Sequence, residues 1–404
     1  MPLVHVHGIA NRQGRAYRRR ERLRDALFQR FALAAIGGGG SDIVLNPYWG
    51  GLAGALSHGG ASFPGTGGYE SFGPAEEEFD EVSALSGLLA LEFATGRAVP
   101  PERYVLETAR RSFTDAVDLL LLAAGAVEHN SSAAELAELA SHLLELPDSS
   151  GPQDASWLDA ADDDRQLLEL LRARVGEGPP SEADTDADAE SEWESFGWLS
   201  DGWAALGRGI TGLRRAQSAD ALAPAVRLLR RLYPHAVPRS MGDIAAYLTH
   251  RGTPDAPGPV PARIIEALDA AVAGKIGGLP LVVVAHSLGG VIAYDVLSHF
   301  RPDIEVDVLV TVGSQVGLFE ELGVLASAGS ARPSGCGSNT VPAGIRQWLN
   351  VVDLNDPLAF LAGPVFDRVS DYRYTSGAPW AHGAYLRQSS FHARLAGHLE
   401  ELAR

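Results

Sequence analysis

The stretch LVVVAHSLGGVIAYDVL, residues 281–297, decides the fold. Its first five residues are all apolar, which predicts a strand buried on both faces of a parallel sheet. From residue 288 onward the apolar spacing is that of a helix. Ser287 stands at the junction, and a sharp strand-to-helix turn that exposes a serine needs small residues two positions before and after it. Ala285 and Gly289 occupy those positions, so the stretch predicts an α/β fold with a nucleophilic serine.

Residues 1–50 predict a second part of the same sheet. An apolar run at 3–7 is followed by a helical pattern and then by the apolar run 42–45. A strand, a helix and a strand within about 45 residues form a βαβ unit, which implies parallel strands.

The same pattern resumes near residue 240. We expect further strands at 306–312 and 349–352 and near 372–374, and a last helix around 390–402. The spacing of Ile264, Leu268, Val272 and Ile276 predicts an amphipathic helix before residue 281.

Residues 51–239 differ from both ends because they carry little strand signal. We expect helices there near 80–95, 101–128, 132–146, 157–176 and 196–232. The stretch 181–194 has seven acidic residues and no basic one, which predicts a solvated linker. The apolar segment 116–127 fits a lid face that meets acyl chains or, more simply, a buried helix. Residues 1–50 and 240–404 therefore predict an α/β core, and 51–239 an inserted helical cap.

The composition narrows the function classes. The 404 residues carry a formal charge of −18, which argues against binding nucleic acid or an anionic membrane. Cys336 is the one cysteine, so an internal disulfide is excluded and a reducing compartment is favoured. No apolar run approaches the roughly 20 residues of a membrane span, and the first residues lack a signal-peptide pattern. We expect a soluble, cytoplasmic protein.

A hydrolytic serine needs a base to take its proton and an acid to orient that base. His382 is the predicted base because it lies in a loop after the last predicted strand. Asp353 and Asp356 both follow the strand 348–352. Asp356 is preferred because it lies further into the loop, and Asp353 is the alternate acid.

Two further groups of residues are predicted around the serine. Backbone amides of Leu288 and of the loop after the first strand, with Ile9 preferred and Gly8 as the alternate, form the predicted oxyanion hole. The basic run that begins at Arg12 and Arg15 predicts attraction of an anionic group to the mouth of the site, unless it is only a solvated helix face. His286 is a third candidate at the mouth.

Several motifs together resemble lipase-like α/β hydrolases, a group of bacterial esterases and of deacylases similar to inositol-deacylating lipases. They are VHVHGI at 4–9, VVVAHSLGG at 282–290, VTVGS at 310–314, WLNVVDLNDPLA at 348–359 and AHGAYL at 381–386. The resemblance covers residues 1–50 and 240–404 and implies hydrolysis of acyl esters through Ser287, Asp356 and His382, without a cofactor. Ala285 departs from the glycine usual at its position, and the insertion 51–239 lies outside the resemblance.

Three alternatives stay open. His5 and His7 share one face of a strand, as in some metal-dependent hydrolases, but the eightfold strand-helix alternation of such barrels is missing. A phospholipase-like effector kept inactive by its cap, with a lipid or a protein partner, is the second. A non-catalytic binding protein that retained the fold is the third.

Overall fold

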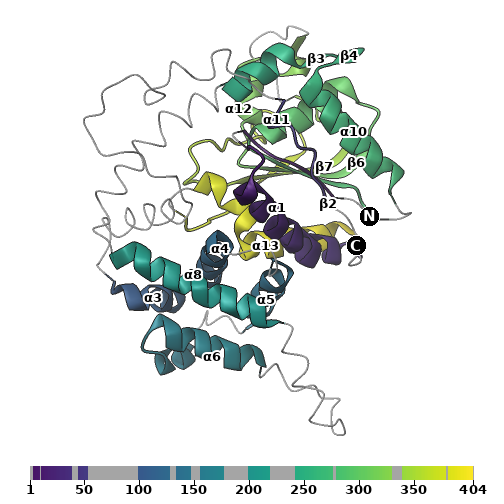
Figure 1. Cartoon of the computed structure of the whole chain (residues 1–404). Coiled ribbons are helices and arrows are strands. Elements are labelled where there is room, and N and C mark those ends of the chain that lie inside the picture. The colour runs from purple at the N-terminus through teal and green to yellow at the C-terminus, as the bar shows by residue number, and fades with distance from the viewer. Residues whose placement is uncertain are drawn as a thin grey trace, which may run out of the picture.

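A six-stranded parallel sheet forms the centre of the protein, as the computed structural model shows (Figure 1). The structure describes residues 3–9, 11–38, 44–52, 99–127, 133–146, 155–176, 199–218, 242–275, 279–329, 339–378 and 381–403. The strands lie in the order β2-β1-β5-β6-β7-β8, and every pairing among them is parallel. Their bounds are β1 Leu3–Val6, β2 Val44–Leu45, β5 Val282–His286, β6 Val306–Val312, β7 Ile345–Val352 and β8 Val369–Arg373. The predicted α/β class and the predicted parallel strands are confirmed.

Alternate residues of each central strand serve the two faces of this sheet, as the period of two requires. Val283 and Ala285 pack with α10 and α11, whereas Val282 and Val284 pack with η1 and α13. Helices thus cover both faces, with α10, α11 and α12 on one side and α1 and α13 on the other (Figure 1). Their bounds are α1 Arg15–Leu27, η1 Phe28–Leu33, α10 Pro259–Ala273, α11 Leu288–Asp295, η5 Val296–Phe300, α12 Val316–Glu321 and α13 Ser389–Ala403. Full burial on both faces explains why residues 282–285 of β5 are all apolar.

The buried face of α10 differs from the predicted one. Leu268 and Ala271 are buried, but Val272 is 45% exposed. A spacing of four advances about 400° around a helix, so each step drifts by about 40° and the third residue leaves the core face. Ile276 lies outside the described residues.

Most of the helices predicted between 99 and 218 are present, with one break. The predicted helix 101–128 divides at Ser112, whose backbone is extended and whose hydroxyl oxygen accepts the N–H of Asp115 at 3.2 Å. Ser112 therefore ends one helix and caps the next. The helices in this region are η2 Pro101–Arg103, α3 Tyr104–Arg111, α4 Phe113–Val127, α5 Ala133–Glu145, η3 Ala155–Ala160, α6 Asp164–Gly176 and α8 Ser200–Ser218. The expectations at 80–95 and 181–194 fall outside the described residues.

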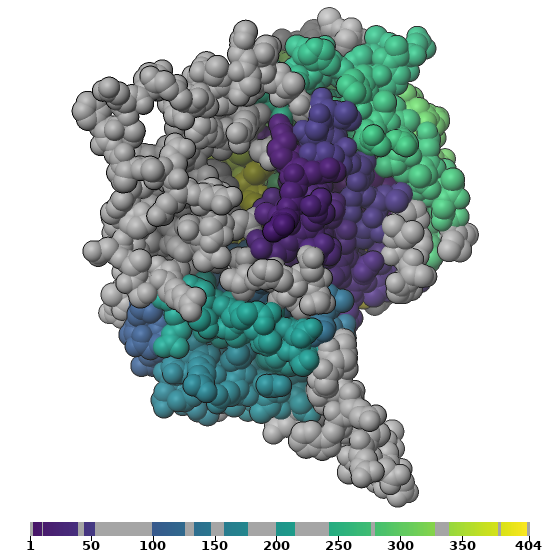
Figure 2. Space-filling view, in the orientation of Figure 1, coloured from purple at the N-terminus to yellow at the C-terminus, as the bar shows by residue number. Residues whose placement is uncertain are grey.

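These helices form a core of their own that includes Leu23 and Leu27 of α1. Within it Ala116, Leu120 and Ala124 of α4 are all buried, which confirms the buried-helix interpretation of segment 116–127. The helices between residues 99 and 218, called the helical segment below, also pack against α13 and against η8 (Tyr385–Arg387). They therefore lie beside the helix layer on one face of the sheet (Figure 1). In Figure 2 the purple surface of α1 lies between the teal helical segment and green α10.

The remaining described elements are short. A hairpin of β3 Gly252–Thr253 and β4 Ala256–Pro257 precedes α10, and residues 242–250 are helical. Three 3-10 turns are η6 Ala326–Gly329, η7 Ala381–Gly383 and η8 Tyr385–Arg387. Among the described helices, none is both long and apolar enough to cross a bilayer.

Candidate active site

Ser287 occupies a strained turn between β5 and α11. Its φ of 57° and ψ of −131° are rare for a residue with a side chain and cost free energy of the order of 1–3 kcal/mol. The turn is fixed because the Ser287 N–H donates to the carbonyl of Val312 at 2.9 Å and its own carbonyl accepts from Gly290 at 2.9 Å. Strain held in place at one serine is typical of a functional site.

Small residues beside Ser287 are a steric necessity. A Cβ added to Gly289 would collide with the carbonyl oxygens of Val6 and His7 on the neighbouring strand. A Cβ added to Gly290 would collide with Ser314. The first turn of α11 therefore approaches β1 and β6 more closely than any side chain would permit.

The three residues predicted to act together lie within hydrogen-bond distance. Ser287 Oγ is 3.0 Å from His382 Nε2, and His382 Nδ1 is 3.0 and 2.9 Å from the two carboxylate oxygens of Asp356. Asp356 is 4% exposed. Burial alone would raise its pKa, but hydrogen bonds from His382, Leu358 and Tyr385 and the charge of His382 lower the pKa below its ordinary value. An ionised Asp356 holds His382 with its proton on Nδ1, which leaves Nε2 free to accept the Ser287 proton.

Asp353 makes different contacts from Asp356, although the two residues are only three positions apart in the sequence. Its two carboxylate oxygens accept the backbone N–H groups of Asn355 at 2.9 Å and Ser376 at 2.7 Å. Asp353 thus closes the turn and ties it to the segment after β8, while Asp356 faces His382.

Two residues of this site were not predicted from the sequence. The Tyr385 hydroxyl donates to Asp356 Oδ2 at 3.0 Å and accepts the Asp353 N–H at 2.8 Å. Gly313 has a φ of 55°, and a Cβ there would lie 2.8 Å from Asp356 Oδ2. The available signals were the position of Tyr385, three residues after His382, and a glycine directly after β6.

The loop after β1 lies against the serine. A Cβ on Gly8 would be 2.7 Å from Ser287 Cβ, so only a glycine lets this backbone come so close. His7 supports the loop: its Nδ1 donates to the Gly8 carbonyl at 2.8 Å and its Nε2 accepts the Trp49 N–H at 3.1 Å. Asn11 donates to the carbonyls of Gly8 at 3.0 Å and Ile9 at 3.2 Å. The predicted donors Gly8 and Ile9 therefore belong to a braced loop beside Ser287.

The other predicted donor, Leu288, is the first residue of α11. An N–H in the first turn has no acceptor within its own helix, so it is available to a ligand, and the helix dipole favours negative charge there.

Comparisons with protein-family models, curated proteins and solved structures gave no match. The geometry of the site therefore carries the functional argument.

Two of the three residues predicted at the mouth, His286 and Arg12, have partners within the protein. His286 Nε2 lies 2.7 Å from the His382 carbonyl, and burial lowers the pKa of His286 to about 3, so neutral His286 donates this bond and braces the His382 loop. Arg12 forms a two-pronged ion pair with the buried carboxylate of Asp243, at 3.1 and 2.7 Å. Asp243 thereby offsets the charge of Arg12, and both Arg12 and Arg15 are exposed.

Among the described residues no three His, Cys, Asp or Glu side chains are grouped to hold a metal, and both nitrogens of His7 are engaged in hydrogen bonds.

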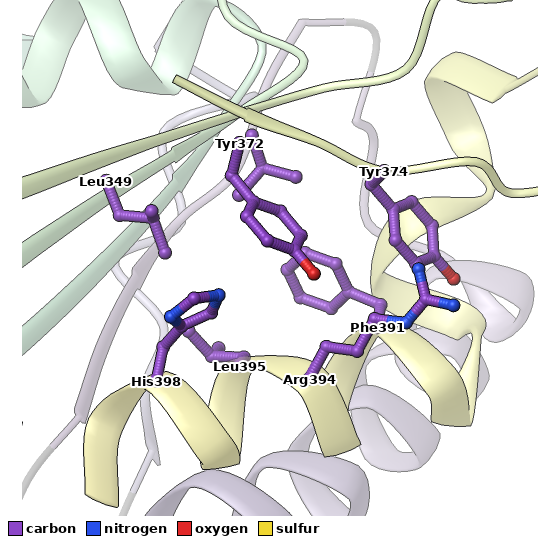
Figure 3. Close-up of a pocket in the computed structure, with 8 residues that line it drawn as sticks. Leu349, Tyr372, Tyr374, Phe391, Arg394, Leu395 and His398 are labelled. Carbon is purple, nitrogen blue, oxygen red and sulfur yellow. The ribbon is translucent and has the colours of Figure 1, made fainter. Parts of the chain in front are cut away.

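An apolar pocket lies between β7, β8 and α13 and shares no residue with the Ser287 site (Figure 3). Its walls are Leu349, Val351, Tyr372, Tyr374, Phe391, Arg394, Leu395 and His398.

Proposed function

We propose that this chain is a serine hydrolase of the α/β-hydrolase type that cleaves carboxylic or lipid acyl esters, with residues 51–239 as an inserted cap. The observation that carries the proposal is the unbroken set of hydrogen bonds from Ser287 through His382 to Asp356, built on a strained turn. The order Ser, Asp, His along the chain and the strand-to-helix setting of Ser287 also support it. The same features support the resemblance to lipase-like hydrolases.

In the proposed reaction His382 Nε2 takes the Ser287 proton while Ser287 Oγ attacks the ester carbonyl carbon. The amide of Leu288 and an amide of the Gly8–Ile9 loop hold the oxygen that becomes negative, which removes about 3–4 kcal/mol per donor from the barrier. His382 then gives its proton to the leaving alcohol, and an acyl group remains on Ser287. Water, deprotonated by His382, releases the acid and restores the enzyme.

The loop that carries Asp356 favours an apolar acyl group. Leu354, Leu358 and Leu361 are 77%, 37% and 46% exposed, while both carboxylates of this loop are buried. The polar backbone of the loop faces inward, where Gln315 donates to the Leu358 carbonyl. A loop with its leucines in water and its acids inside is the reverse of the usual surface pattern, and it is typical of contact with an apolar ligand.

A trapping experiment tests the reaction. Rapid acid quenching after mixing with an activated short-chain ester should leave one acyl group on the peptide that contains Ser287, as read by mass spectrometry. Ser287→Ala should carry none. An acyl group on another residue, or turnover that Ser287→Ala retains, would contradict the proposal.

A substitution series tests the substrate class. Replacing Leu354, Leu358 and Leu361 together by serine should raise KM for a long-chain ester about a hundredfold, because each leucine contributes about 1 kcal/mol of partial burial and about 1.4 kcal/mol is a factor of ten. A short-chain ester should be unaffected. Val272→Ser, at an equally exposed position on α10, is the matched control and should change neither. Equal effects on long and short esters would refute the proposed apolar contact.

The two other function classes give different results in these experiments. A cap-regulated phospholipase-like effector would turn over esters only in the presence of lipid or a protein partner. The ion pair between Arg12 and Asp243 gives no support to an anionic head group at Arg12. A non-catalytic binding protein would form no acyl-enzyme under any condition.

A further inference from the structure

Asp118 links the helical segment to the sheet domain. It lies on α4, is 4% exposed, and receives three hydrogen bonds from the start of α13. Its Oδ1 accepts from Ser389 Oγ at 2.9 Å and from the Ser390 N–H at 3.1 Å, and its Oδ2 accepts from Ser390 Oγ at 2.5 Å. A carboxylate from the predicted insertion thus caps a helix of the sheet domain.

The hydrogen bonds continue from Ser390 through the buried interior. Ser390 Oγ is 2.7 Å from the Tyr374 hydroxyl, which is 2.9 Å from Gln388 Oε1. Gln388 Nε2 donates to the Ser376 carbonyl at 2.6 Å, and the Ser376 N–H donates to Asp353 Oδ2 at 2.7 Å. Each of these residues is at most 5% exposed, so water does not replace the contacts.

The last part of the chain of contacts reaches the candidate active site. The Asp353 N–H donates to the Tyr385 hydroxyl, and this hydroxyl donates to Asp356. Asp356 holds His382. Every step from Asp118 to His382 is therefore a hydrogen bond or the covalent bonds within one residue.

We infer that Asp118 is a positioning residue for the Asp356–His382 pair of the proposed hydrolase, and that it acts through this buried chain. The inserted helices would then set the geometry of the acid and base rather than only shape the access to them. Residues that share one hydrogen-bond network are energetically coupled, and low local polarity strengthens such coupling.

The number of hydroxyl protons in this network explains how a substitution at Asp118 changes hydrogen bonds further along the chain of contacts. Ser390 and Tyr374 have one hydroxyl proton each for three contacts, with Asp118, with each other and with Gln388. Burial raises the pKa of Asp118 to about 6, so it is ionised at pH 8 and accepts the hydrogen bond that the Ser390 hydroxyl donates. Tyr374 then has one proton for Ser390 or Gln388, and its choice depends on Asp118.

Asp118→Asn reverses the direction of the hydrogen bond between residue 118 and Ser390 Oγ, and it keeps the shape of the side chain. Oδ1 must remain an acceptor for Ser389 and the Ser390 N–H, so the new NH₂ group faces Ser390 Oγ and donates to it. Ser390 then donates to Tyr374, and Tyr374 to Gln388. Asp164→Asn is the matched control, because Asp164 is a 1% exposed acid of the same helical segment that caps α3 by accepting the Leu106 N–H at 2.8 Å. Tyr374→Phe interrupts the chain without touching α4.

The experiment compares wild type, Asp118→Asn, Tyr374→Phe, the double variant and Asp164→Asn in the full chain at pH 8. The first readout is the downfield proton resonance of His382 Nδ1–H, which reports the bond to Asp356 whether or not the chain hydrolyses anything. The second is the rate of labelling by a fluorophosphonate. Urea unfolding shows that each variant is folded.

We expect Asp118→Asn and Tyr374→Phe each to shift the resonance and to slow labelling about threefold to tenfold, as expected for network coupling. The double variant should be no slower than the slower single variant. Asp164→Asn should leave both readouts at wild-type values. An unshifted resonance in folded Asp118→Asn, multiplicative effects in the double variant, an equal effect of Asp164→Asn, or a wild type without the resonance would each overturn the inference. A wild type that shows the resonance but is not labelled contradicts the proposed function instead.

Discussion

Replacing Tyr385 by phenylalanine removes a single oxygen from beneath the candidate active site. That oxygen accepts the Asp353 N–H at 2.8 Å and donates to Asp356 at 3.0 Å, and Tyr385 is fully buried. Losing a hydrogen bond to a charged group and leaving a buried N–H without a partner should lower the free energy of unfolding by about 3 kcal/mol. Asp356 would also hold His382 less firmly.

The catalytic effect should fall on kcat. If half of the lost free energy, about 1.5 kcal/mol, also raises the activation barrier, kcat falls about tenfold. KM for a short ester should stay within twofold of the wild-type value, because Tyr385 lies under the site and is not exposed to substrate. Urea unfolding and initial rates measure the two quantities.

Tyr247→Phe is the matched control. Tyr247 is 1% exposed and donates to the buried carboxylate of Asp295 at 2.7 Å, so Tyr247→Phe also removes a buried tyrosine–carboxylate hydrogen bond, but outside the site. This control should lose less stability than Tyr385→Phe, because no backbone N–H loses its acceptor, and it should keep its kcat. An unchanged kcat in Tyr385→Phe, or an equal fall of kcat in both variants, would refute the assigned role of Tyr385.

Three further predictions follow from the same geometry. Gly313→Ala places a Cβ 2.8 Å from Asp356 Oδ2 on a backbone with φ of 55°, so it should cost about 1–2 kcal/mol of stability and most of the proposed esterase activity, measured by urea unfolding and initial rates. Asp356→Asn should lower kcat about 10⁴-fold, whereas Asp353→Asn, which turns an NH₂ group toward a backbone N–H, should chiefly lower stability; the opposite ranking of kcat would show that the acid is misassigned. Burial lowers the pKa of His7 from 6.5 to about 4, so the unfolded chain binds more protons between these values, and His7 contributes about 3 kcal/mol at neutral pH that is lost as the pH falls through this window. Urea unfolding from pH 7 to 4 should show a smaller loss in His7→Gln, and equal slopes would disprove the contribution.

Local patterns in the sequence were sufficient to predict the sheet and the turn at Ser287. An apolar strand followed by a helix with glycines at its start has few other solutions, so β5, α11 and the serine between them could be predicted. In the structure Asp356 contacts His382, whereas Asp353, directly after the strand, closes its own turn.

Contacts between distant segments could not be predicted. Asp243 neutralises Arg12 from more than 200 residues away, and Asp118 caps a helix that begins at Ser389, a partnership that depends on the fold. The role of Tyr385 could not be predicted, because its hydroxyl gains its two partners through tertiary packing and not through sequence spacing. Sequence periodicity identifies the buried face of an element, but the partner of a buried polar group depends on tertiary packing.

Labelling by a fluorophosphonate probe tests the central claim, an activated Ser287, most directly. The probe reacts with a serine only when a neighbouring base takes its proton. We predict that folded wild type is labelled on Ser287 and that Ser287→Ala and His382→Ala are not labelled. A folded wild type that resists the probe, or a His382→Ala variant labelled as fast as wild type, would contradict the claim that Ser287, His382 and Asp356 act as one catalytic unit.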